Sequence, residues 1–499
     1  MHRLLVLALI LSAQDPPKIT DEARQKAVEM LEAAAATVTS ASLPEVQVAA
    51  LMHIAENYQG LDAKKAAEYF QQAFTAAAPV AQRGELQAAI VRLAANVDLP
   101  LAIDLLRQMP PESGSDRGDA LQGVVAKLIE KPDLDQAMAL VEALSVTGDY
   151  PYRAVRNIFE KLPEDDPRRS VLIANAVSAY SARPGKEFQE LLARHWREIP
   201  RPLAESALRA VVTEILERKD EGYTTQNIST VEGNVAFDNR KDMELFNLIH
   251  ALKAMDPKRA EQILANRQNL KGAVERFPEG IASMQKGGSL SISTSSSDQG
   301  APDPKSQAEI QLRSMGHSRQ AAAYEAMSKD PQKALSIAKT IPVPSMQAEV
   351  LAAVARSVGE KDPVAARGVL NQCLSILSDI KEPSDRSGAW ESVAEAAHKI
   401  QDEKLAWEAF DKALADAKEL YKRDTDSDAP NEAIRETWPS TQNYRRIVAR
   451  AAKLFGAAAE PLLLKITDPD LALLARIEMA QVLLGRPRTQ GSTNFMRTR

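Results

Sequence analysis

The residues best suited to bind a metal ion are three alternate aspartates in the segment KRDTDSDAPNEAIRE. Asp424, Asp426 and Asp428 offer carboxylate oxygens, which are the ligands that Ca²⁺ prefers. The EF-hand pattern continues with glycine and glutamate, but Ala429 and Arg435 stand at those positions. The alternative interpretation is an ordinary solvated loop whose charge is partly offset by the basic residues beside it.

The histidines and the single cysteine do not form a recognisable catalytic or metal-binding pattern. The six histidines lie at positions 2, 53, 195, 250, 317 and 398, so none pair at the spacing of two zinc ligands on one helix. We expect His53 and His398 to be exposed or at the edge of the core. Cys373 lies on the apolar side of a predicted helix, which favours a buried structural thiol over a nucleophile. The sequence also lacks H-E-x-x-H, G-x-S-x-G and a phosphate-binding glycine loop. We therefore predict no catalytic, metal-ligating or cofactor-binding residues.

Two tryptophans lie among arginines and could stack on a sugar, a peptide or a carboxylate. Trp196 follows His195 in LLARHWREIPRP, and Trp438 lies in AIRETWPSTQNYRR. The alternative is that each indole ring fills a gap between helices, which is the commoner role of a tryptophan. We expect that packing role for Trp390 and Trp407, which lie in or beside apolar positions of predicted helices.

The elements that would position these side chains are short helices that recur about every 35 residues. The segment LMHIAENYQGLDAKKAAEYFQQAF, residues 51–74, predicts two helices joined by a tight turn, each with one apolar face. Neither helix can bury its apolar face alone, so each needs a neighbouring copy. The first-helix pattern recurs in four sets: Leu51/Ile54/Ala55/Tyr58, Leu86/Ala89/Ile90/Leu93, Leu121/Val124/Val125/Leu128 and Val155/Ile158/Phe159/Leu162.

An aspartate precedes the second helix of each predicted pair, and an alanine follows one turn later. Aspartate is a good N-cap because its carboxylate accepts a hydrogen bond from a free backbone N–H. Proline follows it directly at positions 257, 331 and 363, where a helix tolerates proline best. The aspartates in this frame are Asp62, Asp98, Asp133, Asp256, Asp330, Asp362 and Asp402.

The best-formed repeat resembles a tetratricopeptide repeat. The match runs Trp390-x2-Val393-Ala394-x2-Ala397-x8-Ala406-x3-Phe410-x2-Ala413, and residues 51–73 are similar with one residue fewer at the turn. Most other copies lack the tryptophan, glycine and proline positions of that family. The resemblance implies a helix–turn–helix unit of about 34 residues that stacks into a superhelix, with a concave groove that binds proteins or peptides.

These patterns predict an all-α protein in which helix–turn–helix repeats stack as an α-solenoid in two arrays. The N-terminal array spans residues 20–285, with an irregular insert at 219–240 that is a long loop or a small hairpin. The C-terminal array spans 306–485. A Ser/Gly-rich segment, 286–305, predicts a flexible linker between them. The basic tail, 486–499, is expected to be disordered.

The N-terminus is typical of a secretory signal peptide. It carries a basic residue, Arg3, then an apolar run over 4–11 and a small-residue exit at Ser12-Ala13. The apolar run is too short to span a bilayer as a helix. We therefore expect residues 1–13 to be removed and the chain to be exported to the periplasm or the cell exterior.

Charge and composition limit the partners that the chain can have. A formal net charge of -6 and a pI near 5.8 argue against nucleic acid as the main partner. The leading hypothesis is an exported, non-enzymatic scaffold that binds a protein or peptide. The alternatives are a cell-wall- or carbohydrate-active helical enzyme, and a module that assembles with copies of itself. An aromatic content of 5% makes a sugar-binding cleft harder to line.

Overall fold

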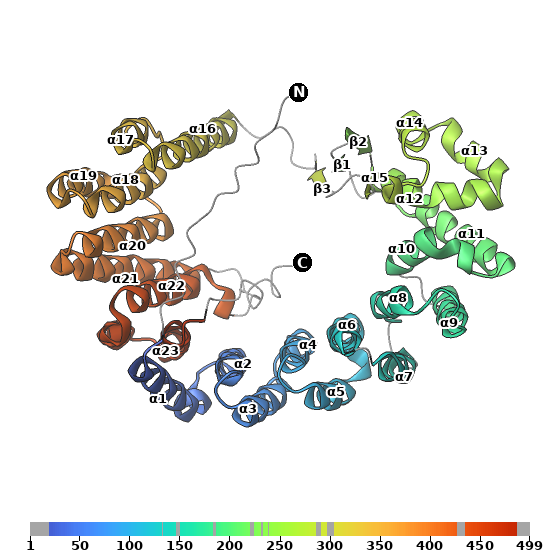
Figure 1. Cartoon of the computed structure of the whole chain (residues 1–499), viewed down its shortest axis with the longest axis horizontal. Helices are drawn as coiled ribbons and strands as arrows, with labels where there is room; N and C mark the ends of the chain where they lie inside the picture. The colour runs from blue at the N-terminus through green and yellow to red at the C-terminus, as the bar shows by residue number, and fades with distance from the viewer. Residues whose placement is uncertain are drawn as a thin grey trace. The chain divides into compact units, whose positions relative to one another are not determined.

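The computed structural model describes residues 19–131, 133–145, 150–182, 186–219, 224–230, 233–237, 239–285, 291–296, 304–426 and 435–486. Within these ranges the chain forms twenty-three α-helices and one three-stranded sheet (Figure 1). No helix in these ranges is both long and apolar enough to cross a bilayer. The predicted all-α class is confirmed, with a small sheet added to it.

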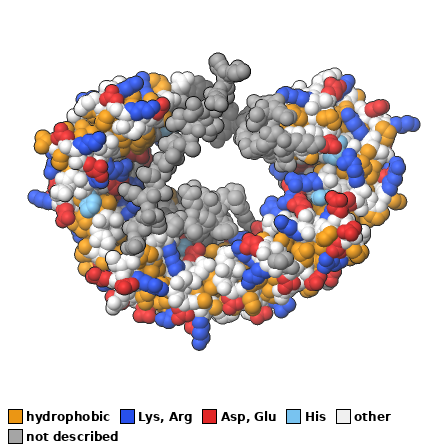
Figure 2. Space-filling model, in the orientation of Figure 1, with side chains coloured by type: hydrophobic (Ala, Val, Ile, Leu, Met, Phe, Trp, Pro, Cys, Tyr) orange, Lys and Arg blue, Asp and Glu red, His pale blue; other side chains and the backbone are white. Residues whose placement is uncertain are grey.

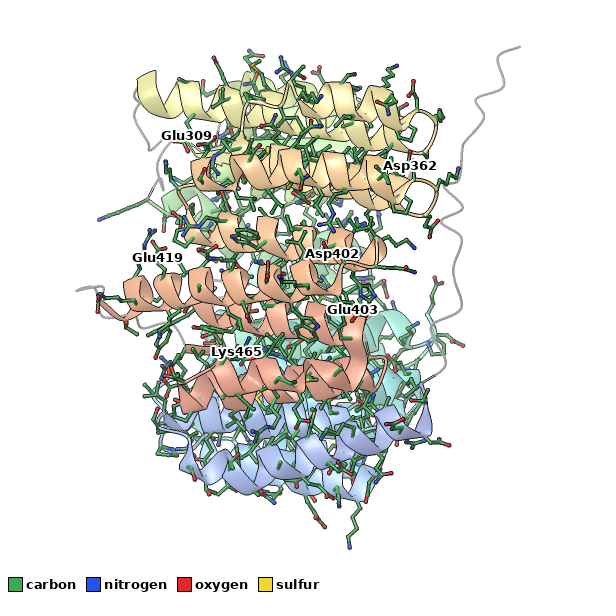
Figure 3. All side chains as sticks on the ribbon, turned by 90° about the vertical axis from the view of Figure 1, so that its left-hand side faces the viewer. Glu309, Asp362, Asp402, Glu403, Glu419 and Lys465 are labelled. Atoms are coloured by element: carbon green, nitrogen blue, oxygen red, sulfur yellow. The ribbon has the colours of Figure 1, made fainter. Side chains whose placement is uncertain are left out.

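The repeating unit is a pair of helices joined by a short turn. In one such pair, α2 (Pro44–Tyr58) leads into α3 (Ala63–Ala76), and the Asp62 carboxylate accepts hydrogen bonds from backbone N–H groups in the first turn of α3. Figure 3 shows two of the capping aspartates, Asp362 and Asp402, at the same edge of the stacked helices. Each predicted cap accepts such a bond: Asp62, Asp98, Asp133, Asp256, Asp330, Asp362 and Asp402.

The chain divides into two compact units that do not coincide with the two predicted arrays. Unit 1 combines residues 1–86 with 304–499, and unit 2 consists of residues 87–303. The helix α4 (Arg83–Ala94) spans the boundary. The first predicted array is therefore not one body, because its N-terminal helices pack with the C-terminal array. The other helices of unit 1 are α1 (Asp21–Thr37), α16 (Pro304–Met327), α17 (Pro331–Ala338), α18 (Pro344–Gly359), α19 (Pro363–Ile376), α20 (Pro383–Lys399), α21 (Glu403–Asp426), α22 (Pro439–Phe455) and α23 (Pro469–Leu483).

The first and last helices of the described residues, α1 and α23, pack on each other. In unit 1, α16, α18 and α20 each pack on the helix that follows it, whereas α23 packs on α1 and on α2 (Figure 1). Lys26 on α1 forms an ion pair of 2.8 Å with Glu460, just before α23. Arg486 donates hydrogen bonds of 2.9 and 2.5 Å to the Glu56 and Asn57 carbonyls at the end of α2. The prediction of a disordered tail is thus wrong for Arg486, and the rest of the tail lies outside the described residues.

Unit 2 consists of helical pairs followed by shorter helices. Figure 1 shows α6, α8, α10 and α12 along the inner side of this unit's curve, with α7, α9, α11 and α13 along its outer side. Successive inner helices pack on one another, as the repeat pattern predicts. The helices are α5 (Leu99–Gln108), α6 (Gly114–Glu130), α7 (Leu134–Ser145), α8 (Tyr152–Lys161), α9 (Arg168–Ala182), α10 (Lys186–His195), α11 (Arg201–Glu217), α12 (Arg240–Met255), α13 (Pro257–Ala265), α14 (Gln268–Arg276) and α15 (Ile281–Gln285).

A small antiparallel sheet completes unit 2. Its strands are β1 (Thr224–Thr230), β2 (Gly233–Phe237) and β3 (Ser291–Ser296), in the order β2-β1-β3. The hairpin of β1 and β2 is one of the two structures predicted for the insert. The third strand lies inside the predicted flexible linker, so that prediction is wrong for these six residues. Phe237 anchors the sheet by packing on Phe246 of α12, with ring centroids 5.2 Å apart.

The predicted register of the first helices is confirmed by burial. Leu86 is fully buried, and Leu121 is 2% exposed. Replacing either with alanine is expected to lower the free energy of unfolding by about 2–5 kcal/mol, because a cavity remains where the side chain packed. Urea denaturation measures the change. The matched control is Leu464→Ala, since Leu464 is 82% exposed. Equal, near-zero losses at all three positions would contradict the register.

Candidate functional site

The segment predicted to be a calcium-binding loop is helical as far as Asp426, the last of its residues before the undescribed part. Asp424 and Asp426 lie in the last turn of α21, and Asp428 lies outside the described residues. Residues two apart on a helix do not face each other, so these two carboxylates do not converge on one ion. Asp424 instead accepts a hydrogen bond of 3.1 Å from the backbone N–H of Ser440. Among the described residues, no group of three or more His, Cys, Asp or Glu side chains could hold a metal ion.

The singled-out cysteine and tryptophans have partners inside the protein. Cys373 is buried, its thiol donates to the Ala348 carbonyl at 3.2 Å, and burial raises the pKa of the thiol to about 12. Trp407 stacks on Phe455 with ring centroids 4.3 Å apart. Trp196 and Trp438 are half-buried, and arginines lie over their rings, 4.6 and 5.7 Å from the centroids. These geometries favour packing roles.

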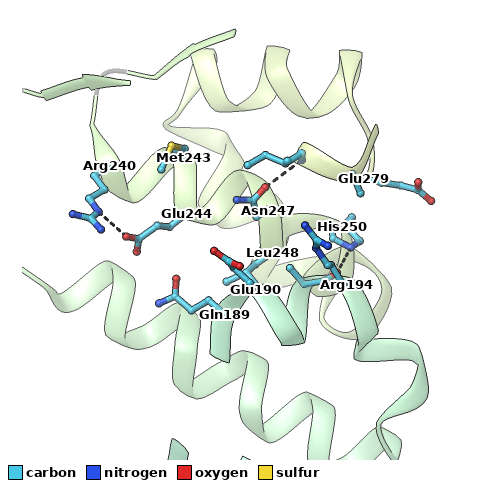
Figure 4. A pocket seen from close by; sticks show the side chains of 13 residues that line it. Gln189, Glu190, Arg194, Arg240, Met243, Glu244, Asn247, Leu248, His250 and Glu279 are labelled. Atoms are coloured by element: carbon cyan, nitrogen blue, oxygen red, sulfur yellow. Dashed lines mark hydrogen bonds and ion pairs between the residues drawn. The ribbon is translucent and has the colours of Figure 1, made fainter. Parts of the chain in front are cut away.

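A pocket of about 320 Å³ opens between α10, α12 and α15 of unit 2 (Figure 4). Apolar and polar side chains share its walls, which is typical of sites that bind small molecules or short segments. Figure 4 shows Gln189 and Arg194 of α10 on one wall and Asn247 of α12 on the other. Its lining residues are Gln189, Glu190, Ala193, Arg194, Arg240, Met243, Glu244, Asn247, Leu248, His250, Glu279, Ile281 and Ala282.

Three local contacts hold the walls of this pocket in place. The His250 ring nitrogen Nε2 lies 3.1 Å from the Ala193 carbonyl and ties α12 to α10. The Asn247 side-chain oxygen accepts a hydrogen bond of 3.2 Å from the backbone N–H of Ile281 at the start of α15. Gly280 has a φ of +62°, and a Cβ there would lie 2.7 Å from the Phe246 carbonyl oxygen, so only glycine permits this approach of α15 to α12.

Two polar atoms of the pocket walls lack a hydrogen-bond partner among the described residues. They are Nε2 of Gln189 and Nδ1 of His250. Burial lowers the pKa of His250, so its ring is neutral at pH 7. The ring interacts with two backbone carbonyls, those of Ala193 and Asn247, and both groups are acceptors only. Both of these atoms are buried, so neither is exposed to the open space of the pocket.

A second hollow, of about 510 Å³, lies beside α5, the end of α6 and the start of α7. Asp104 and Arg107 on its rim pair with each other at 3.6 Å, and Asp133 is occupied as the cap of α7. Within the described part of the chain, none of its lining residues carries a buried polar atom without a partner. It is therefore less suited to bind a specific ligand.

A cluster of four charged side chains is buried in unit 1. His53 of α2 contacts the Glu436 carboxylate, which also accepts a hydrogen bond of 2.6 Å from Arg445 of α22. Arg445 donates a second bond, of 2.8 Å, to Glu478 of α23. We call these four residues the ion network. Each is at most 5% exposed. The expectation that His53 is exposed or at the core edge is therefore wrong.

A second set of ion pairs lies beside the ion network and joins the same elements. Arg435 donates to Asp468 at 2.7 Å and to Asp470 at 3.1 Å. Asp470 also accepts hydrogen bonds from the backbone N–H and hydroxyl of Ser42, at 2.8 and 2.5 Å. The segment before α2, the segment before α22 and the start of α23 are thus held by buried charges.

His53 and Glu436 of the ion network are both charged at neutral pH. Burial alone would lower the pKa of His53, but the neighbouring Glu436 carboxylate outweighs it and raises the pKa to about 9. Burial alone would raise the pKa of Glu436, but His53 and Arg445 lower it to about 2. The buried charges compensate one another, which fits a structural role.

The contribution of the His53–Glu436 pair to stability is expected to depend on pH. The His53 pKa is raised, so its contribution is complete below pH 6.5 and is lost as the pH rises through about 9. The Glu436 pKa is lowered, so its contribution is complete above pH 4.5 and is lost as the pH falls towards about 2. Urea denaturation should show the largest difference between wild type and His53→Gln between pH 4.5 and 6.5. A difference that grows from pH 7 to 9 would contradict this assignment.

Comparison with known proteins identifies no family for this chain. No protein-family model and no curated protein matches it. Among solved structures it is similar to a chain titled "Circular tandem repeat protein with novel repeat topology and enhanced subunit contact surfaces". The identity is 13%, the TM-score is 0.18, and the match covers 93% of this chain and 96% of that chain. A TM-score of 0.18 does not establish a shared fold. The chain is a helical-repeat protein on the basis of its own stacked pairs, and the tetratricopeptide resemblance stays a prediction.

Proposed function

We propose that the chain is a non-enzymatic helical-repeat scaffold that binds a protein or peptide partner. The observation that carries this proposal is the pocket on the inner side of unit 2, whose walls combine apolar and polar side chains. Parallel rows of helices place side chains from successive repeats on one continuous surface, which suits recognition of an extended segment. The tetratricopeptide-like pattern of residues 390–413 supports the same class of function by analogy of fold.

The charge distribution favours a protein partner over nucleic acid. Figure 2 shows acidic and basic side chains interspersed over the visible face of the described residues. A binding surface for nucleic acid needs a continuous basic face, because it must neutralise a row of phosphates. The ion network does not favour catalysis, since its carboxylates and its histidine are buried and paired with one another.

We also propose that the chain is exported. The support is the sequence of residues 1–13, which lies outside the described residues. Intact-mass measurement on protein recovered from the native host tests this, and a mature chain that begins at Gln14 is expected. A chain that retains Met1 and stays in the cytoplasm would refute export.

Affinity capture with paired variants tests the binding function. Tagged wild type, Met243→Trp and Gln262→Trp are used to capture proteins from the native host's envelope and medium. Met243 lines the pocket, so tryptophan there fills it, whereas Gln262 is exposed on α13. One partner should be captured in near-stoichiometric amount by wild type and Gln262→Trp, and lost with Met243→Trp. Equal recovery of the partner by all three chains would place the binding site outside the pocket. Failure to capture any partner would count against the scaffold function.

A further inference from the structure

We infer that the N-terminal half of α16 is a contact surface for a second copy of this chain, on which the α16 helices of two copies pack antiparallel. This inference goes beyond the proposed function, because it concerns unit 1 and not the pocket of unit 2. It rests on the exposed apolar side chains of α16, on the extent of the neighbouring helices and on the order of the charges along α16.

Exposed apolar side chains are concentrated on this helix. Among the described residues, seven large apolar side chains are exposed, and three of them belong to α16. Leu312 is 44% exposed and Met315 is 48% exposed. These two residues are three positions apart, so they are neighbours on the helix surface. Adjoining exposed apolar side chains, unlike isolated ones, are typical of an interaction surface.

The partner helix of the same pair is too short to cover this face. α16 has 24 residues, whereas α17 has 8. The next pair is more evenly matched, since α18 has 16 residues and α19 has 14. A helix rises 1.5 Å per residue, so about 24 Å of α16 has no counterpart in α17. Figure 1 shows α17 beside one part of α16 only.

The next helix of the row does not cover the face either. Gly316 marks the place where the start of α18 meets α16, since a Cβ on Gly316 would lie 2.7 Å from the Met346 sulfur. The residues of α16 before Gly316 extend about 18 Å past this contact. Leu312 and Met315 lie in that extension, which explains why they are exposed.

The charges beside the apolar face are self-complementary. Glu309 lies about one turn before Leu312, and Arg313 lies next to Leu312. Their side chains are 64% and 63% exposed and pair with each other at 3.1 Å. When two copies pack antiparallel about a point near residue 311, Glu309 of each copy lies opposite Arg313 of the other. Opposite charges then meet, whereas a parallel arrangement would bring like charges together.

The two-fold symmetry of this contact favours a second copy over an unrelated partner. Each α16 covers the apolar face of the other, and the contact closes after two chains, as in most homodimers. The extension of α16 is only about three turns long. The interface is therefore small, and we expect a monomer–dimer equilibrium with a dissociation constant of about 1–100 μM.

Analytical ultracentrifugation of the full chain, over a concentration series that spans this range, tests the inference. Wild type is compared with Leu312→Glu, Met315→Glu and the control Leu464→Glu, which places the same charge at a side chain of unit 1 that is 82% exposed. We expect each α16 variant to weaken dimerisation at least about ten-fold, because a carboxylate would be buried without a partner. The control should dimerise as wild type does. The monomers of all four chains should melt at the same temperature, since the replaced side chains are exposed.

Charge reversal tests the antiparallel arrangement. Glu309→Arg and Arg313→Glu should each weaken dimerisation, because like charges then face each other across the two-fold axis. The double variant restores opposite charges and should dimerise as wild type does. A double variant that dimerises less well than either single variant would overturn the antiparallel arrangement.

The outcomes also separate this inference from the proposed function. Wild type that remains monomeric throughout the series would overturn the inference, and so would a dimer that Leu312→Glu and Met315→Glu leave intact. If wild type is monomeric and Leu312→Glu loses the partner captured from the native host, the face belongs to that partner instead. Met243→Trp fills the pocket of unit 2 and should leave dimerisation unchanged.

Discussion

Replacement of Glu436 by alanine is expected to lower the free energy of unfolding by about 3–5 kcal/mol. Glu436 is 5% exposed and is the shared partner of His53 and Arg445. Its removal takes away the carboxylate that keeps His53 protonated and leaves Arg445, whose Nη2 lies 3.5 Å from the His53 ring nitrogen, with Glu478 as its remaining partner in the ion network. The loss of stability therefore includes the cost of an incompletely paired buried charge as well as the lost hydrogen bonds. Urea denaturation followed by circular dichroism measures it.

The control for this prediction is Glu419→Ala. Glu419 also pairs with two arginines, Arg386 at 2.8 Å and Arg423 at 2.9 Å, but its side chain is 48% exposed. Exposed ion pairs contribute about 0–1 kcal/mol, so the control should lose little. If Glu436→Ala lost no more than Glu419→Ala, the ion network would not be a buried, coupled unit.

Removal of α23 is expected to release α1 from unit 1. A chain that ends at Lys465 lacks the helix on which α1 and α2 pack. Leu31 and Met30 of α1 are at most 3% exposed and would lose part of their cover. Hydrogen exchange of the backbone amides of residues 21–37 should approach the rate of an unstructured peptide, because a single helix of this length is marginal in water. The pair α18–α19 should keep its protection, since its neighbours remain.

The matched control removes only residues 487–499 and so retains α23 together with Arg486. Protection of α1 should then equal that of the full chain. Equal protection of α1 in the chain that ends at Lys465 would contradict the pairing of the first and last helices.

The repeat was predictable because its signals are local. The apolar spacing at Leu51, Leu86 and Leu121 and the seven capping aspartates depend only on residues within one or two turns. A cap such as Asp62 forms with its own helix whatever else the chain does. The order in which pairs stack is also largely local, because consecutive helices usually pack together.

The packing of α1 on α23 in unit 1 could not be predicted in this way. The apolar faces of α1 and α23 are compatible with any neighbour of the same type, and nothing local to either helix specifies the other. The ion network likewise depends on packing between distant parts of the sequence, because His53 contacts Glu436 only where α2 lies beside the segment before α22. In the sequence, His53 is one more polar residue within an apolar helix.

Composition misled the prediction for the segment between the units. Serine and glycine suggested a linker, but β3 pairs with β1 through backbone hydrogen bonds, which depend little on side chains. Ile292 stands opposite Ile228 in the register, and this apolar residue among serines was the available signal. The pocket had no comparable signal, since the insert separates the two helices that carry Gln189 and His250.

Site-specific photocrosslinking tests the central claim most directly, namely that the inner-side pocket of unit 2 binds a polypeptide. A benzophenone amino acid replaces Met243 in the pocket or, as control, Gln262 on α13, and each chain is irradiated in its native host. The account predicts one crosslinked polypeptide from position 243, none from position 262, and a crosslinked residue within an extended segment of the partner. Identical products from both positions, or no polypeptide product from position 243, would contradict it.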